Sequence, residues 1–174
     1  MADRQSRVEL YFLRHADAGD PEAWTRPDAE RPLSAKGRRQ AERLGRHLAS
    51  LGFKPDAILT SPKARAAETA EIVGEALGRD ATVVDGLAGP LDIEDVAEII
   101  ADHTSAGRIV VVGHDPDFSE LAAEIIGAPE VALKKGALAR IDLDGPVERG
   151  QRTLSGSLRW LLPPDAIPPA IPGE

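Results

Sequence analysis

The sequence contains no cysteine and no long apolar run, and it has fewer basic than acidic residues. Without cysteine there is no disulfide, no thiolate metal site and no cysteine nucleophile, so cysteine-dependent phosphatases and proteases are excluded. No segment approaches the roughly 18 apolar residues of a membrane-spanning helix, and the first residues, MADRQSRVE, lack the apolar core of a signal peptide. We therefore expect a soluble protein that stays in the cytoplasm.

The charge balance narrows the class of partner. The chain carries 21 basic and 29 acidic residues, which gives a formal net charge of -8 and a pI of about 5.1. Non-specific nucleic-acid binding needs a basic surface that displaces phosphate counterions, so this balance argues against it. An anionic ligand would need a local basic pocket. With 174 residues, 42% of them hydrophobic, the chain is long enough for one domain with a sizeable core.

Short β-branched runs alternate along the chain with longer segments of helical periodicity. The predicted strands, apolar enough to be covered on both faces, span Val8 to Leu13, Ala57 to Leu59, Thr82 to Val84 and Ile109 to Val112. The predicted helices span Ala35 to Leu51, Pro62 to Leu77, Ile93 to Asp102 and Pro116 to Ile126. Two more strands are expected at Ala137 to Leu143 and Thr153 to Leu161. The alternation predicts an α/β fold, a three-layer α/β/α sandwich with a mostly parallel central sheet.

The same pattern gives the expected domain organisation. Residues 8–162 should form a single domain, preceded by an N-terminal extension of residues 1–7 and followed by a proline-rich tail of residues 163–174. The tail reads PPDAIPPAIPGE, with five prolines and little to bury, so we expect it to be extended or disordered.

Three of the predicted strands end in groups that can bind or attack an anion. The first runs into Arg14 and His15, the second into the TSPKAR segment with Arg65, and the fourth into His114. In an open α/β sheet, ligands bind in the crevice beyond the carboxyl ends of the strands. We therefore expect the two histidines to face one crevice.

Two predicted helix starts add further donors. Ser61 is a preferred N-cap and Pro62 a preferred first helical residue, which places Arg65 in the opening turn. In RPLSAKG, Ser34 is the predicted N-cap and Arg31 lies in the loop just before it. Guanidinium groups suit bidentate phosphate contacts. Together with the arginine of the first strand end and the two imidazoles, they predict a phosphate pocket.

Four motifs, LRHADA, RPLSAKG, SPKARAAET and VVGHDP, resemble in order and spacing those of the histidine phosphatase superfamily, specifically its small SixA-type phosphohistidine phosphatases. The resemblance covers roughly Val8 to Pro163, nearly the whole chain. It implies the phosphoglycerate mutase-like sandwich fold and a phosphatase that needs neither a metal nor another cofactor. One departure is Ala16, since the superfamily usually has glycine after this histidine.

The resemblance also implies a mechanism. His15 would be the nucleophile, attacking phosphorus through one ring nitrogen while a backbone carbonyl holds the other. Water would then hydrolyse the phosphohistidine intermediate. The groups expected to bind the phosphate oxygens are Arg14, Arg31, Arg65 and His114, with His114 working as the imidazolium.

The general acid has no clear motif. Larger members of the superfamily carry a carboxylate beyond the third strand, and here that region reads VVDGLAGPLDIED. Asp85 and Asp92 are the nearest candidates, and Asp17 is a third. A phosphohistidine substrate leaves through a nitrogen that is easily protonated, so it depends less on a strong acid than a phosphate ester does.

We therefore predict a metal-independent phosphatase that removes phosphate from phosphohistidine on a signalling or phosphotransfer protein. No insertion is large enough to close a cap over a small metabolite, so the site should admit a protein side chain. The acidic loop of residues 16–34 would gate the site or contact a partner, or is simply solvated. The alternatives are a broad small-molecule phosphomonoesterase and a non-catalytic phosphate-binding module. Neither nucleic acid nor a membrane is an expected partner.

Overall fold

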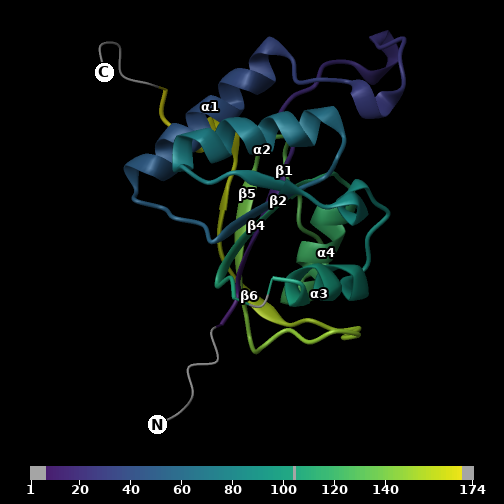
Figure 1. The fold of residues 1–174 in the computed structure, drawn as a ribbon, viewed down its shortest axis with the longest axis vertical. Helices are drawn as coiled ribbons and strands as arrows, with labels where there is room; N and C mark the ends of the chain where they lie inside the picture. The colour runs from purple at the N-terminus through teal and green to yellow at the C-terminus, as the bar shows by residue number, and fades with distance from the viewer. Residues whose placement is uncertain (1–6, 104, 170–174) are drawn as a thin grey trace.

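The central element of the fold is a six-stranded sheet in the order β3-β2-β4-β1-β5-β6 (Figure 1). The computed structural model describes residues 7–103 and 105–169. The strands span Glu9–Arg14 (β1), Ala57–Thr60 (β2), Ala81–Val83 (β3), Arg108–Gly113 (β4), Leu138–Leu143 (β5) and Gly156–Leu162 (β6). Strands β1 to β4 are parallel to their neighbours among themselves, whereas β5 and β6 pair antiparallel, so the sheet is mostly parallel.

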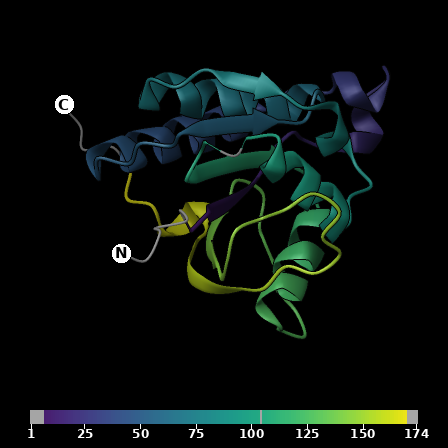
Figure 2. The ribbon, with the colours of Figure 1, turned by 60° about the horizontal axis from the view of Figure 1, so that its bottom comes forward.

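Two helices cover each face of the sheet. They span Ala35–Ser50 (α1), Ala64–Leu77 (α2), Ile93–Ala101 (α3) and Asp117–Ile126 (α4), with 3-10 turns at Pro21–Ala23, Asp28–Glu30, Asp85–Ala88 and Pro164–Ala166. Along β1, Leu10 and Phe12 belong to the buried cluster with α3 and α4, whereas Tyr11 and Leu13 belong to the cluster with α1 and α2. Such alternation is expected of a strand buried on both sides. The two clusters and the helices on opposite sides of the sheet (Figure 2) confirm the predicted three-layer α/β/α sandwich.

Two local predictions were wrong. The second helix begins at Ala64 rather than Pro62: Lys63 occupies the cap position without a side-chain bond, and the Ser61 hydroxyl, which also bonds His114, accepts from the Lys63 backbone N–H at 3.2 Å one residue earlier. The strand predicted at Thr82 to Val84 is the edge strand β3, and its residues Thr82 and Val83 are exposed instead of being covered on both faces. The predicted cap of the first helix is confirmed, since the Ser34 hydroxyl accepts a hydrogen bond from the backbone N–H of Gly37.

The prediction of an extended tail with little to bury was wrong for residues 163–169. Pro164–Ala166 forms a 3-10 turn, and Ile167 is 3% exposed within the cluster between the sheet and helices α1 and α2. One apolar side chain is enough to dock the segment, because proline restricts the unfolded chain and so lowers the entropy lost on ordering. The rest of the predicted tail, like residues 1–6, lies outside the described residues.

Ile167 should therefore contribute to folding. We expect Ile167→Ala to lower the free energy of unfolding by about 2 to 3 kcal/mol, since it removes buried methylene groups and leaves a cavity. Urea denaturation of the variant measures the change. Leu51→Ala, which truncates a similar apolar side chain where it is 68% exposed, is the matched control and should leave the midpoint nearly unchanged; an equal midpoint for Ile167→Ala would show that the segment does not dock.

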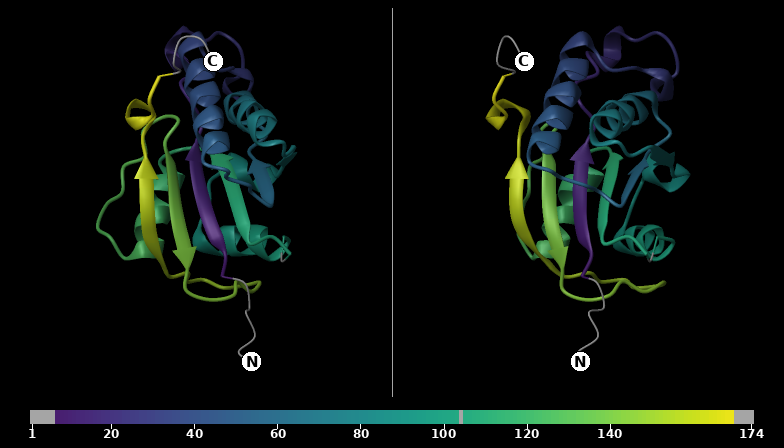
Figure 3. Two further views of the ribbon diagram at one scale, coloured as in Figure 1. Left: turned by 90° about the vertical axis from the view of Figure 1, so that its left-hand side faces the viewer. Right: turned by 60° about the vertical axis from the view of Figure 1, so that its left-hand side comes forward.

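The topology brings the predicted functional residues to one edge of the sheet. Strands β2, β4 and β1 are adjacent and parallel, so their carboxyl ends, where Ser61, His114 and His15 follow, lie side by side. The loop between β1 and α1 extends beyond these strand ends (Figure 3). Among the described residues, no helix is long and apolar enough to cross a membrane.

Candidate active site

His15 follows β1 directly and is 6% exposed. Its backbone N–H donates to the Gly113 carbonyl at 2.9 Å, which ties the residue to the end of the neighbouring strand β4. The ring Nδ1 lies 2.7 Å from the Ala16 carbonyl oxygen, and since a carbonyl only accepts, Nδ1 carries the hydrogen. In the neutral ring this leaves the lone pair on Nε2.

His114 lies beside His15 at the end of β4. The centroids of the two rings are 5.3 Å apart, so both histidines face one site, as the strand-end argument predicts. His114 Nε2 is 2.8 Å from the Ser61 hydroxyl oxygen, whereas its buried Nδ1 has no hydrogen-bond partner among the described residues. Ser61 is thus the partner of His114, and its hydroxyl also accepts from the backbone N–H of Lys63 at 3.2 Å, just before α2.

Burial keeps both rings neutral in the free protein. Desolvation lowers the pKa of His15 to about 4, and the positive charges of Arg65 and Arg14 add a smaller lowering. The hydrogen bond to the Ala16 carbonyl acts in the opposite direction but does not cancel these effects. Desolvation and the neighbouring His15 lower the pKa of His114 to about 3. The prediction that His114 works as the imidazolium concerns the phosphate-bound site, where the negative charge of the phosphate would have to overcome this desolvation.

The lowered pKa values make stability depend on pH. The unfolded histidines take up protons below pH 6.5, whereas folded His15 does so only near pH 4, so acid favours the unfolded state across that window. The wild type should lose about 1.5 kcal/mol more between pH 6.5 and about pH 5 than His15→Gln, which has no ring to protonate. Urea denaturation at several pH values measures this difference. Equal pH slopes for the two proteins would contradict the lowered pKa.

Two arginines, one buried and one partly buried, point donors into the same site. Arg65, the second residue of α2, is 6% exposed, and Arg14, the last residue of β1, donates from NH1 to the Leu133 carbonyl at 2.8 Å. The Nε atoms of both arginines are buried and have no hydrogen-bond partner among the described residues, and the only other such side-chain atom there is Nδ1 of His114. A buried polar group without a partner costs about 1 to 3 kcal/mol, so their gathering at one place indicates a site built for an oxyanion.

Asp28 is a candidate that sequence reasoning missed. Its carboxylate accepts from Arg65 NH2 at 2.9 Å, and its backbone carbonyl accepts from Arg65 NH1 at 2.9 Å. Its other carboxylate oxygen lies 3.2 Å from Arg31 Nε. In the sequence, only its position three residues before Arg31 sets it apart from the other acidic residues of the loop. Asp28 thus takes both terminal nitrogens of Arg65, which leaves Nε as the donor without a partner among the described residues.

Arg31 lies beside Arg65, because both arginines bond the Asp28 carboxylate. It is 8% exposed, and its NH1 donates to the Ala18 carbonyl at 2.8 Å. With its Nε on Asp28, Arg31 holds the 18–28 segment of the loop together beside Arg65. These bonds use Nε and Nη1, so the predicted phosphate contact of Arg31 would be made through Nη2.

The three predicted acids lie in different environments. Asp92 caps α3, where its carboxylate accepts from the backbone N–H of Asp95, and Asp85 is exposed at the start of a 3-10 turn. Asp17 accepts from the Ser34 hydroxyl at 2.5 Å and lines a cavity together with Arg14. The Ser34 hydrogen bond, against partial burial, holds the pKa of Asp17 below its usual range. Of the three, Asp17 is thus the one that shares a cavity with a residue of the site, and its carboxyl is ionised.

Comparison with known proteins assigns this arrangement to a family. The sequence model of the histidine phosphatase superfamily (branch 1) matches residues 10–89. The SixA phosphohistidine phosphatase of Escherichia coli is 27% identical over 162 residues, which cover 90% of this chain and 94% of that protein. The chain belongs to the histidine phosphatase superfamily. An uncharacterised protein of Picosynechococcus is 34% identical over 168 residues, 90% of this chain and 100% of that protein.

A solved structure shows the same fold within this superfamily. The structure of the protein histidine phosphatase SixA complexed with tungstate superimposes with a TM-score of 0.78 at 24% identity, covering 91% of this chain and 98% of that one. The predicted family and fold class of this histidine phosphatase are therefore confirmed. The chain is a SixA-like hydrolase of the superfamily.

Proposed function

We propose that the protein is a phosphohistidine phosphatase that acts through His15 on a phosphorylated signalling or phosphotransfer protein. The proposal rests on one observation: the free lone pair of a histidine ring lies in the same site as buried nitrogens that have no hydrogen-bond partner among the described residues. The Nε2 atom of His15 is not held by the Ala16 carbonyl, and the buried unpartnered nitrogens of the described chain belong to Arg14, Arg65 and His114. The likeness to E. coli SixA supports the substrate class.

The geometry supports a two-step reaction. His15 Nε2 attacks phosphorus as the bond from phosphorus to the substrate nitrogen breaks, and the leaving imidazole takes up a proton. The arginines and His114 bind the phosphoryl oxygens and stabilise their charge in the transition state. Water then attacks the phosphorylated His15, which releases inorganic phosphate and restores the free ring.

The ionised carboxylates of the site favour a nitrogen leaving group. Although burial opposes it, the hydrogen bond from Arg31 and the charge of Arg65 hold the pKa of Asp28 below its usual range. Asp17 is likewise held ionised by Ser34. A carboxylate that stays ionised is a weak proton donor near neutral pH, and an imidazole leaving group needs a donor less than an alkoxide does. A protein phosphohistidine is therefore a better substrate for this site than an unactivated phosphate ester.

The test compares two substrates in the presence of EDTA. We expect kcat/KM for a phosphohistidine-bearing carrier protein to exceed that for the unactivated ester glycerol 2-phosphate by at least about 100-fold, since an alkoxide leaving group needs a strong acid and an imidazole does not. If the ester is hydrolysed faster than the phosphohistidine protein, the mechanism through His15 still holds, but the protein is a broad phosphomonoesterase. Tight phosphate binding without turnover of either substrate would make it a binding module.

A further inference from the structure

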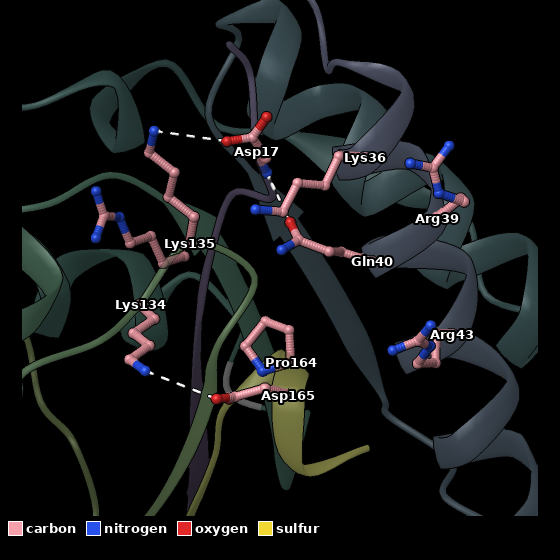
Figure 4. Close-up of a pocket in the computed structure, with 10 residues that line it drawn as sticks. Asp17, Lys36, Arg39, Gln40, Arg43, Lys134, Lys135, Pro164 and Asp165 are labelled. Atoms are coloured by element: carbon pink, nitrogen blue, oxygen red, sulfur yellow. Dashed lines mark hydrogen bonds and ion pairs between the residues drawn. The ribbon is translucent and has the colours of Figure 1, made fainter. Parts of the chain in front are cut away.

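A basic groove adjoins the site on the side of α1 (Figure 4). It is a cavity of about 590 Å³ between the start of α1, the segment before β5 and the 3-10 turn after β6. Apart from Gln40 and Pro164, every residue that lines it is charged. Six of these are basic, namely Arg14, Lys36, Arg39, Arg43, Lys134 and Lys135, and two are acidic, namely Asp17 and Asp165. Arg14 belongs to both the groove and the phosphate site, so the two are continuous.

Three of the basic residues form a stripe along α1. Lys36, Arg39 and Arg43 follow one another at three and four residues, the spacing of one helix face, and the stripe extends for about 10 Å. Figure 4 shows the three side chains along the same side of the groove. This length matches several separate anionic groups better than a single phosphate.

The stripe is unfavourable for the helix itself. Lys36 stands in the first turn, where the helix dipole favours acidic residues, and Arg39 and Arg43 are like charges at the i,i+4 spacing. Within residues 7–103 and 105–169, no carboxylate lies within 4.0 Å of any of the three, whereas Arg38 on another face pairs with Glu68 at 3.2 Å. Apart from the longer-range attraction between Lys36 and Asp17, the described residues offer the stripe no ion pair, which points to a partner outside the chain.

We propose that the groove binds an acidic helical segment of the phosphorylated partner protein while its phosphohistidine enters the site at Arg14 and His15. This inference rests on the proposed function and adds the chemistry by which the partner is recognised. Because the chain carries a net charge of -8, its overall field repels an acidic partner, and the groove supplies the local attraction that selects one orientation. Small-molecule pockets are mostly apolar with a few polar groups, and this open, charged groove differs from them.

The first test measures binding without catalysis. The probe is a fluorescein-labelled helical peptide with glutamates at the spacing of the stripe, and the proteins carry His15→Ala. We expect Arg39→Gln/Arg43→Gln to raise the Kd at least about tenfold at about 0.01 M salt and much less at about 0.15 M, where screening weakens the contacts. Lys54→Gln/Arg79→Gln, which removes two exposed charges outside the groove, should leave the Kd unchanged. Equal Kd values for the two double variants would overturn the proposal.

Competition decides between a protein and a small polyanion. If tripolyphosphate occupies the groove far more tightly than the peptide does, the partner is a small polyanion and the protein assignment is wrong. A peptide of the same composition, scrambled so that its glutamates do not share a face, should bind more weakly than the first. Equal binding of the two peptides would contradict the match to the helical stripe.

The second test uses the active protein. The ratio of kcat/KM for an acidic phosphohistidine protein to that for p-nitrophenyl phosphate should fall at least about tenfold in Arg39→Gln/Arg43→Gln, through KM, because the small ester does not reach the stripe. An unchanged ratio would overturn the groove as a determinant of the substrate. If the wild type does not turn over phosphohistidine protein at all, the proposed function fails, and the peptide measurement still decides whether the groove binds an acidic segment.

Discussion

His15→Ala should lower kcat for phosphohistidine protein by at least about 10³-fold, because the variant has no group that can form the covalent intermediate. The neighbouring His114 cannot take over the attack easily, since its Nε2 is held by Ser61 at 2.8 Å and its Nδ1 serves as a donor to the phosphate in the proposed mechanism. Residual turnover would come only from water attacking a phosphate bound by the arginines. Release of inorganic phosphate under single-turnover conditions measures the loss.

The control is a histidine outside the site whose Nδ1, like that of His15, bonds a backbone carbonyl. His103 is half-buried near the end of α3, where its Nδ1 bonds the Ile99 carbonyl at 2.9 Å. His103→Ala should keep turnover within about twofold of the wild type, since it touches none of the site residues. Mass spectrometry of acid-free quenched samples should detect phosphate on His15 during turnover. Full activity of His15→Ala, or phosphate on another residue, would show that His15 is not the nucleophile.

The strand-end argument predicted the centre of the site for a topological reason. Once the alternating pattern indicates a parallel sheet, residues that follow neighbouring strands must meet, and Arg14, His15 and His114 do so at the ends of β1 and β4. The wrong helix start at Ser61 shows the limit of local signals. Its hydroxyl accepts from the backbone N–H of Lys63, as the dipeptide Ser-Pro indicates, but it also bonds His114, 53 residues away, and the helix begins only at Ala64.

Features that depend on long-range packing could not be predicted. Asp28 meets Arg65 only because a 3-10 turn folds the loop back onto α2, and nothing in its neighbourhood distinguishes it from the other loop acids. The basic groove needs α1 and Lys134, about one hundred residues apart, to lie side by side. Ile167 is an apolar residue in a proline-rich segment, and its burial depends on a surface that exists only in the fold.

Arg65→Ala should lower kcat/KM by about 10² to 10³-fold, the usual loss when one preorganised donor to a developing oxyanion is removed. The guanidinium is 6% exposed and its Nε has no partner among the described residues, so its charge acts on a bound phosphate with little screening. Arg65→Lys should recover only part of the loss, because an ammonium group cannot make two parallel contacts. Thermal unfolding of each variant separates a folding defect from a catalytic one, and activity near that of the wild type in folded Arg65→Ala would remove Arg65 from the phosphate site.

Asp28→Asn should strengthen the binding of inorganic phosphate, whereas Arg65→Ala should weaken it. The carboxylate holds Arg65 at 2.9 Å and repels an incoming phosphate, whereas an amide does neither as strongly. The inhibition constant for inorganic phosphate should therefore fall by about tenfold in Asp28→Asn, while it rises in Arg65→Ala. If Asp28→Asn instead leaves phosphate inhibition unchanged and slows ester hydrolysis as much as Arg65→Ala does, Asp28 delivers a proton to the leaving group. The substrate preference would then come from the basic groove and not from a missing acid.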